Sequence, residues 1–324
     1  MYACIDLGSN SFHLLIGEWI DGRISIIERC SEKVQLGEGV PASGLISPAA
    51  FQRGLDCLRN FETLMSRHGV LRYWALGTNT FRIAANADQF ILAAADIGLE
   101  ISIISGVQEA VLIYAGVQTG LPEAGDNRLI IDIGGGSTEL IVGSGDQRFI
   151  TQSLPIGCVS WRDRFFTSQE GADRARLDAS LAEASNAAMG IFQSVAPGIN
   201  HYDWLEAYAS SGTAKMLAAI CQEQGGPEGQ IELKSLQRSR DLFLDTIVSD
   251  RELAGLKDKR RDLLLPGYAI MEALLRAVSC PLVSFSATAL REGMLDFIVR
   301  SGETTHLLDP SKLPDVSDID YADS

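Results

Sequence analysis

Residues 131 to 143 read Ile-Asp-Ile-Gly-Gly-Gly-Ser-Thr-Glu-Leu-Ile-Val-Gly, and this stretch decides the fold. The apolar residues 129–131 predict a short buried strand that Asp132 ends. The three glycines that follow predict a tight turn, because residues without Cβ reach φ > 0 and let the backbone approach a ligand closely. Backbone N–H groups of such a turn form a concave anion site. The pattern predicts a strand–turn–strand phosphate site, with a carboxylate on each side of the turn at Asp132 and Glu139.

The same stretch occurs a second time, at residues 5 to 17, as Ile-Asp-Leu-Gly-Ser-Asn-Ser-Phe-His-Leu-Leu-Ile-Gly. Aligned without gaps at an offset of 126 residues, six positions are identical: Ile5, Asp6, Gly8, Ser11, Leu14 and Gly17 match Ile131, Asp132, Gly134, Ser137, Leu140 and Gly143. His13 takes the place of Glu139. Two copies, each opening about half of the chain, predict duplicated lobes that hold a phosphate between two hairpins.

Length and composition set the class of protein. A chain of 324 residues, 46% hydrophobic and 21% charged, favours two globular domains. No apolar run reaches the roughly 18 residues of a membrane-spanning helix, and the N-terminus has no secretory leader pattern, so a cytoplasmic protein is expected. Six cysteines without a C-x-x-C pair and four scattered histidines argue against a zinc site or a disulfide framework.

The net charge of −15 restricts the partners. It argues against nucleic acid and against anionic membranes as general partners. A polyanionic substrate would need a local basic channel or divalent cations, since the chain as a whole would repel it.

The apolar patterns predict an α/β protein. Strands are expected at residues 2–6, 12–19, 24–28, 73–76, 101–104, 129–131, 140–142, 148–154, 204–209 and 282–285. Helices are expected from Ser47 to Gly69, and at 83–95, 110–118, 161–166, 174–195, 214–222, 231–248, 251–256, 263–278 and from Ala289.

Two further segments place polar residues after strand ends, where open α/β sheets hold ligands. Arg82 follows the strand at 73–76, so substrate binding is favoured over a surface salt bridge. Ser211-Gly212-Thr213 follows the strand at 204–209 and opens a helix, which is a phosphate-binding position, and Lys215 could supply a cation there.

These motifs carry a resemblance. The two glycine turns resemble the phosphate loops of the actin/hexokinase/Hsp70 superfamily. The amino-acid sequences of the two turns resemble those of the exopolyphosphatase/guanosine pentaphosphate phosphohydrolase (Ppx/GppA) family. Further matches to that family are Gly77, Thr78, Arg82, Ala84 and Asn86; Ser105, Gly106, Glu109 and Ala110; Ser211-Gly212-Thr213; Arg260 and Asp262; and Ala289 to Gly293. The chain departs from it at Ser210, where alanine is usual, and at Ala287-Thr288, where Asp-Gly is common.

The resemblance covers about residues 1–300 and implies a fold. It implies two duplicated actin-like (ribonuclease H-like) domains, at 1–124 and 125–300, with an active-site cleft between the lobes. The final helix is expected to return to the first lobe, and residues 301–324 are expected to form an acidic, flexible tail. The chain resembles short, two-domain members that lack the further helical domain of longer relatives. A homodimer stays open, because dimerisation in longer relatives rests partly on that domain.

The resemblance also implies an activity, the release of terminal phosphate from inorganic polyphosphate or from guanosine pentaphosphate, a stringent-response nucleotide. Glu109 is implied to orient and deprotonate the attacking water. Asp132 and Glu139 are the other candidate catalytic residues, and with Asp6 they are candidate ligands of Mg²⁺, which prefers oxygen ligands. The candidate phosphate-binding residues are Gly8, Ser9, Asn10, Ser11, Arg82, Gly134, Gly135, Gly136, Ser137, Thr138, Ser211, Gly212, Thr213 and Lys215. Arg291 is a further candidate contact.

Two alternatives stay open. One is a small-molecule kinase or ATPase of the same superfamily, which would need an acceptor hydroxyl and an adenine pocket. The other is an inactive scaffold that senses polyphosphate or guanosine tetraphosphate, against which the joint presence of Glu109, Asp132 and Glu139 argues.

Overall fold

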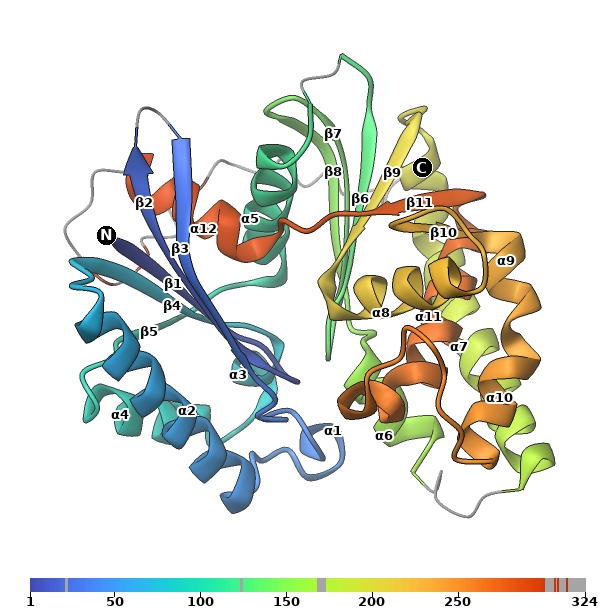
Figure 1. Ribbon diagram of the computed structural model, residues 1–324, viewed down its shortest axis with the longest axis horizontal. Helices are drawn as coiled ribbons and strands as arrows, with labels where there is room; N and C mark the ends of the chain where they lie inside the picture. Colours follow the sequence, from blue (N-terminus) through green and yellow to red (C-terminus); the bar gives the residue numbers. More distant parts are fainter. Residues whose placement is uncertain are drawn as a thin grey trace. The chain divides into compact units, whose positions relative to one another are not determined.

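The computed structural model describes residues 1–20, 23–122, 125–167 and 173–300, and the single residues 306, 308 and 313. These residues form two compact units. The described residues of Met1–Pro122 and Thr288–Val316 make unit 1, and those of Glu123–Ala287 make unit 2. Each unit is a mixed β-sheet with flanking helices (Figure 1). The Asp-Gly pair at residues 21 and 22, which predicts a hairpin turn between the strands expected at 12–19 and 24–28, lies outside the described residues. The same holds for residue 124 at the expected boundary and for nearly all of the expected tail at 301–324.

The sheet of unit 1 has the strand order β3-β2-β1-β4-β5. Strands β1, β2 and β3 form an antiparallel meander, while β4 and β5 add to β1 in parallel. The strands are β1 (Tyr2–Leu7), β2 (Phe12–Ile20), β3 (Arg23–Glu32), β4 (Arg72–Gly77) and β5 (Ile101–Ile103). Ala3, Ile5 and Leu7 alternate along β1 into one apolar core, because side chains of a strand point to opposite faces in turn.

The helices of unit 1 are α1 (Val40–Ser43), α2 (Pro48–Arg67), α3 (Asn79–Ile83), α4 (Ala87–Ala95), α5 (Gly106–Thr119) and α12 (Leu290–Arg300). Of these, α2, α5 and α12 confirm expected helices, whereas α1 was not expected. Helix α2 begins as predicted, with the Ser47 hydroxyl accepting a hydrogen bond from the Ala50 N–H and with Pro48 in the first turn.

The single helix expected at 83–95 is wrong. Ala84 is extended, and the chain forms α3 and then α4. The Asn86 side chain explains the break: its amide accepts a hydrogen bond from the Ile46 N–H at 2.8 Å and donates one to the Ile46 carbonyl at 3.0 Å. These bonds fix the segment between the helices to the chain before α2.

Helix α12 packs across α5 within unit 1. A Cβ added at Gly116 would lie 1.7 Å from the Ala289 carbonyl oxygen, and one added at Gly293 would lie 1.9 Å from the Leu112 carbonyl oxygen. Only glycine permits two helix backbones to approach this closely. The final helix, which the sequence assigned to the range 125–300 and expected to return to the first lobe, therefore belongs with unit 1.

The sheet of unit 2 has the order β10-β11-β9-β6-β7-β8. Strands β6, β7 and β8 repeat the antiparallel meander, and β9 and β11 add to β6 in parallel, before β10 closes the edge antiparallel to β11. The strands are β6 (Arg128–Ile133), β7 (Thr138–Ser144), β8 (Gln147–Leu154), β9 (Glu206–Ser210), β10 (Gln230–Glu232) and β11 (Leu282–Phe285).

The helices of unit 2 are α6 (Cys158–Phe165), α7 (Arg174–Asn200), α8 (Ser211–Glu223), α9 (Leu233–Arg238), α10 (Arg240–Val248) and α11 (Leu264–Ala277), with a 3₁₀ turn η1 (Asp258–Leu263). The helix expected at 231–248 is wrong at its start, because Ile231 pairs with Val283 as strand β10. The helix expected at 251–256 is absent, since Gly255 has φ +84° and packs against the Ala219 carbonyl. None of the helices described is long and apolar enough to cross a membrane.

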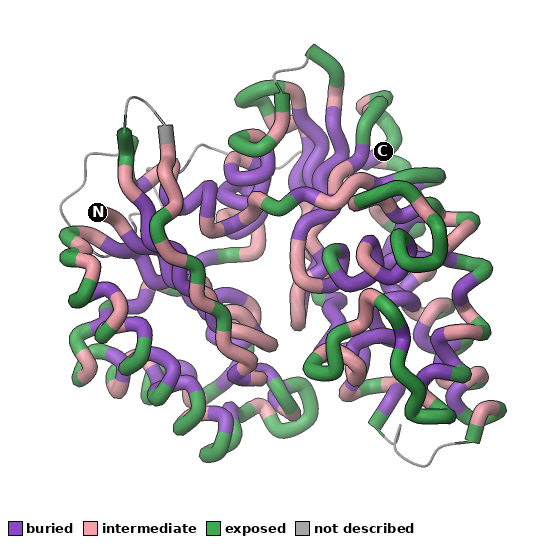
Figure 2. Tube along the Cα trace, in the orientation of Figure 1, coloured by how far each residue is buried: buried purple, intermediate pink, exposed green. Residues whose placement is uncertain are grey.

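The duplication seen in the sequence is present in the strand register. Asp6 lies opposite His13 across β1 and β2, and Asp132 lies opposite Glu139 across β6 and β7. Each meander is followed by a parallel strand on the same side of its first strand, β4 in unit 1 and β9 in unit 2. In both units the central strands are buried, as the purple tube in Figure 2 shows. Each glycine turn therefore lies at the end of a buried hairpin.

Candidate functional site

The first glycine turn, Gly8 to Ser11, joins β1 to β2 and is held by the chain that follows β3. The Gln35 N–H donates to the Asn10 carbonyl at 2.8 Å, and the Gly37 N–H donates to the Ser9 carbonyl at 2.9 Å. These bonds satisfy the two carbonyls and hold the backbone of the turn against the Gln35–Gly37 segment.

Side chains add to this turn. The Thr80 hydroxyl donates to the Ser9 hydroxyl at 2.8 Å, and both residues are buried. The Asn10 Nδ2 donates to the Ser11 hydroxyl at 3.4 Å. The Asn10 Oδ1 is buried and has no hydrogen-bond partner within the described part of the chain. A buried acceptor without a donor costs free energy, so a ligand or ordered water with an N–H or O–H group fits here.

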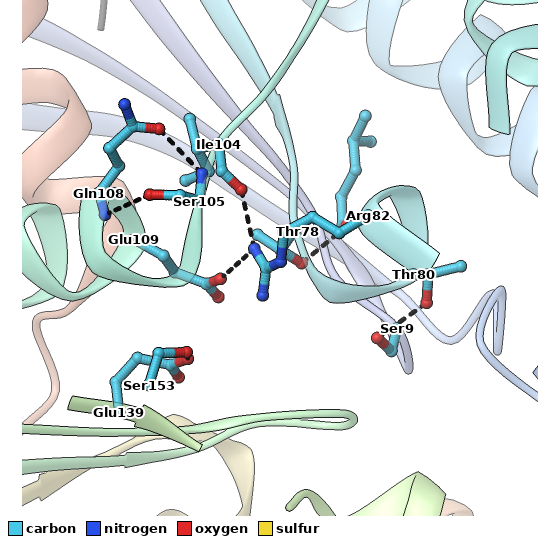
Figure 3. A network of polar contacts seen from close by, with 11 residues as sticks. Ser9, Thr78, Thr80, Arg82, Ile104, Ser105, Gln108, Glu109, Glu139 and Ser153 are labelled. Carbon is cyan, nitrogen blue, oxygen red and sulfur yellow. Dashed lines mark hydrogen bonds and ion pairs between the residues drawn. The ribbon is translucent and has the colours of Figure 1, made fainter. Parts of the chain in front are cut away.

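Arg82 and Glu109 form an ion pair in unit 1. The Arg82 Nη1 donates to Glu109 Oε2 at 3.0 Å and to the Ile104 carbonyl at 2.8 Å (Figure 3). The side chains are only 21% and 11% exposed. Within the described residues the other guanidinium nitrogens of Arg82 make no hydrogen bond, so they can bind an anion beside the Glu109 carboxylate.

The start of α5 positions Glu109. The Ser105 hydroxyl accepts from the Gln108 N–H at 3.1 Å, and the Gln108 side chain accepts from the Ser105 N–H at 2.8 Å. This capping box satisfies two backbone donors of the first turn and fixes the helix start. The helix was expected from Ala110, and its earlier start at Gly106 brings Glu109 into a rigid first turn.

The second glycine turn, Gly134 to Gly136 in unit 2, is held by backbone alone. The Cys158 N–H donates to the Gly134 carbonyl at 2.9 Å, and the Val159 N–H donates to the Gly135 carbonyl at 2.8 Å. A Cβ at Gly157 would lie 2.5 Å from the Gly135 carbonyl, so only glycine fits against the turn. The segment before α6 thus takes the place that the Gln35–Gly37 segment has in unit 1.

Two carboxylates flank this turn. The Ser153 hydroxyl donates to Glu139 Oε1 at 2.8 Å, and Glu139 is fully buried. The Ser210 hydroxyl donates to Asp132 Oδ2 from the neighbouring strand β9. The Thr138 hydroxyl donates to the Ile156 carbonyl at 2.6 Å, so it is occupied by the fold. Ser137 is buried beside it.

The Ser211-Gly212-Thr213 turn begins α8 directly after strand β9, which pairs with the strand β6 that carries Asp132. Ser211 has φ +89°, a left-handed conformation that is strained for a residue with a side chain. The Thr213 hydroxyl donates to the Ile133 carbonyl at 3.0 Å and contacts the Cys158 sulfur at 3.1 Å. The Lys215 side chain is exposed on the first turns of α8.

Arg260 is a cation that the sequence analysis did not place in the site. A Cβ at Gly212 would lie 1.8 Å from Arg260 Nη2, so the guanidinium rests on the Gly212 backbone at the start of α8. Burial lowers the pKa of Arg260 from its usual value. Its side chain has no ion pair or hydrogen bond among the described residues, and a helix start repels a cation. An anion bound here would compensate both for the burial of the guanidinium charge and for its repulsion by the helix start. The only sequence signal was its match to the Arg-x-Asp pattern.

The Cys158 thiol lies behind the second turn. Burial raises the pKa of the Cys158 thiol to about 11, while its hydrogen bond with Thr213 and the Arg260 charge partly oppose that. The thiol is therefore neutral at neutral pH and acts as packing between the turn and α8.

The donor set fits Mg²⁺ in part. Mg²⁺ is usually held by one or two carboxylates together with substrate phosphates and waters. Asp132 and Glu139 are neighbouring carboxylates of one hairpin, which matches that pattern. No group of three or more His, Cys, Asp or Glu side chains among the described residues could hold a metal unaided. Asp6 belongs to the other unit, so its part in a metal site, like the cleft between the lobes, stays a prediction.

The fold and the site define the class of protein. Two mixed sheets with flanking helices and a repeated hairpin make a chain of two actin-like domains. The chain matches the Ppx/GppA phosphatase family over residues 15–301, and it belongs to that family.

Solved structures agree with this assignment. An exopolyphosphatase from Cytophaga hutchinsonii is 26% identical, with a TM-score of 0.82 over 94% of this chain and 99% of that one. A Ppx/GppA enzyme from Aquifex aeolicus is 25% identical, with a TM-score of 0.72 over 91% and 98% of the two chains. A second structure of an Aquifex aeolicus family member, at 24% identity and a TM-score of 0.73 over 93% and 98%, supports the fold.

Proposed function

We propose that this protein hydrolyses phosphoanhydrides and releases terminal phosphate from inorganic polyphosphate. The observation that carries the proposal is the pair of Arg82 and Glu109, a fixed carboxylate beside a guanidinium with nitrogens left to bind an anion. The likeness to an exopolyphosphatase along 99% of that chain supports polyphosphate as the first substrate to test. Guanosine pentaphosphate, which presents the same terminal anhydride, is the second.

In the proposed reaction Glu109 accepts a proton from water as the water oxygen attacks the terminal phosphorus. The bond from that phosphorus to the bridging oxygen breaks, and the shortened chain leaves with the bridging oxygen and its negative charge. The Arg82 guanidinium holds the Glu109 carboxylate in place through the ion pair at 3.0 Å and so orients the proposed base. Proton transfer of this kind contributes about 10²–10⁴-fold, so charge stabilisation must supply the rest.

Phosphate oxygens are proposed to bind the N–H groups of both glycine turns and the Ser211–Thr213 turn. Arg82 in unit 1 and Arg260 in unit 2 are proposed to add positive charge locally, which a chain of net charge −15 needs for a polyanion. Asp132 and Glu139 would hold Mg²⁺, with Asp6 assisting. When bound, Mg²⁺ would neutralise phosphate charge during bond cleavage.

The experiment is release of inorganic phosphate from polyphosphate, guanosine pentaphosphate and ATP, each with Mg²⁺ and with EDTA. Release from polyphosphate that depends on Mg²⁺ and is lost in Glu109→Gln supports the proposal. Phosphate transfer from ATP to an acceptor, without hydrolysis of polyphosphate, would favour the kinase alternative. Tight polyphosphate binding without any release would favour the sensor.

A further inference from the structure

The hydroxyl pair of Thr80 and Ser9 has no counterpart in unit 2. At an offset of 126 residues, the position of Ser9 is taken by Gly135, which has no side chain. In unit 1 the Thr80 hydroxyl donates to the Ser9 oxygen at 2.8 Å (Figure 3). A hydroxyl carries one hydrogen and two lone pairs. Since Ser9 accepts from Thr80, its own hydrogen is left to donate to another oxygen.

The surroundings hold this pair in one arrangement. Thr80 is 1% exposed and Ser9 is 6% exposed. A Cβ at Gly37 would lie 2.7 Å from Thr80 Oγ1 and 2.8 Å from Ser9 Cβ, so the absence of a side chain there gives the pair its room. The Gly37 N–H also fixes the Ser9 carbonyl at 2.9 Å. Within the described residues no acceptor takes the Ser9 hydroxyl hydrogen.

We propose that Thr80 is a positioning residue that aims the Ser9 hydroxyl hydrogen at a phosphate oxygen of the substrate. The inference rests on the proposed function, because the acceptor is a phosphate of the bound polyphosphate. The bond from Thr80 polarises the Ser9 hydroxyl and makes it a stronger donor, as hydrogen bonds in a chain strengthen one another. Unit 1 thereby grips phosphate with a side-chain donor at the position where unit 2 can use only backbone.

The test compares Thr80→Val with Thr78→Val. Both isosteric changes remove a buried hydroxyl near the start of α3, but the Thr78 hydroxyl donates to the Leu7 carbonyl at 3.3 Å and not to Ser9. We expect similar falls in melting temperature. Only Thr80→Val should raise KM for polyphosphate, by about 10-fold, the scale of a hydrogen bond to a charged group. The dependence of KM on salt should not change, because no charge is lost, and Thr80→Ser should restore KM.

A double-mutant cycle decides whether Thr80 acts through Ser9. Ser9→Ala should raise KM at least as much as Thr80→Val, and the double variant should match Ser9→Ala alone. Additive effects, or equal KM values for the Thr78 and Thr80 variants, would overturn the inference. If Thr80→Val does not fold, Thr80→Ala is the second route: it removes the hydroxyl without placing a methyl group in its position, and it should raise KM, but not in the Ser9→Ala background. A wild-type protein that releases no phosphate would instead refute the proposed function.

Discussion

The two glycine hairpins share a backbone but differ in what holds and equips each turn. In unit 1 the turn carries hydroxyl and amide side chains, and Thr80 and the Gln35–Gly37 segment hold it. In unit 2 the turn is bare glycine, Gly157 presses on it, and the carboxylates Asp132 and Glu139 flank it. The duplication kept the strand register of the hairpin, while the side chains at the turn diverged. We therefore expect equivalent positions to respond differently to substitution.

The largest effect should follow from Glu109→Gln, which tests whether the base belongs to unit 1. The change keeps size and hydrogen bonding to Arg82 but removes basicity, so turnover should fall by about 100-fold or more. Glu206→Gln is the matched control, because it removes a carboxylate from the Arg128 ion pair at 3.0 Å in unit 2. Turnover and melting temperature should be measured on the same preparations. Turnover within a few-fold of wild type would remove Glu109 from the mechanism.

The second prediction compares Glu139 with His13, the residue at the equivalent position of the first hairpin. Glu139→Gln should lower the affinity for Mg²⁺ by about 10–100-fold, the loss typical when the shell of a metal site is damaged. His13→Gln, at the equivalent register position, should leave the Mg²⁺ requirement unchanged. The readout is the Mg²⁺ concentration for half-maximal phosphate release. Equal shifts in the two variants, or full wild-type activity in EDTA, would contradict the assignment of the metal to the second hairpin.

How far the sequence predicts these differences depends on the range of the interactions. Strand, turn and register are local, so the repeated pattern predicted both hairpins and the facing pair of Asp132 and Glu139. Arg82 and Glu109 were each placed after a predicted strand, but their ion pair was not predicted, because it joins residues 27 positions apart in the chain. Gly37 and Thr80 act on Ser9 through contacts between segments 28 and 71 residues away along the chain, which no local pattern encodes.

The wrong and missing predictions in unit 2 also result from contacts between residues that are far apart in the sequence. Residues 231–248 have helical spacing, but Ile231 is taken by a strand partner more than fifty residues further along, and tertiary pairing overrides the local preference. Arg260 matched the Arg-x-Asp pattern of the family, but this match did not predict its contact with the start of α8. Its position follows from the contact with Gly212, and the sequence showed only that a glycine was present there.

A third prediction concerns Arg260, the cation that lies against the Ser211–Thr213 turn. Arg260→Gln should raise KM for polyphosphate by about 10-fold and weaken its dependence on salt, since an anion–guanidinium contact is lost. Arg260→Lys should recover part of both, because lysine keeps the charge without the planar fork. Arg164→Gln is the control: Arg164 is exposed and stacks on Trp161 and Phe165. An unchanged KM at low salt in Arg260→Gln would remove Arg260 from substrate binding.

A fourth prediction tests how the second turn is held. Gly157→Ala places a methyl 2.5 Å from backbone atoms of Gly135 and Gly136, so it should destabilise the protein by about 1–3 kcal/mol. Gly190→Ala lies inside α7, where an added Cβ would meet no atom beyond the adjacent backbone of its own helix, and it should instead be neutral or stabilise by up to about 1 kcal/mol. Denaturant unfolding of both variants gives the measurement. A Gly157→Ala protein as stable as wild type would mean that the turn can move.

The last prediction is that the Cys158 thiol is not alkylated in the folded protein. It tests whether the segment behind the second turn opens in solution. Since only the thiolate is alkylated and the pKa of Cys158 is raised to about 11, about one thiol in a thousand is ionised at pH 8. Burial excludes the reagent as well. Burial raises the pKa of the Cys30 thiol as well, but Cys30 is partly exposed. Iodoacetamide at pH 8 should therefore label Cys30 of unit 1 slowly and leave Cys158 unlabelled, as mass spectrometry of peptides would show. Labelling of Cys158 should rise as the pH approaches 11, because its thiolate forms there, and the unfolded protein should label fully at pH 8. Cys158 labelled at pH 8 as fast as Cys30 would mean that the segment behind the second turn opens often in solution.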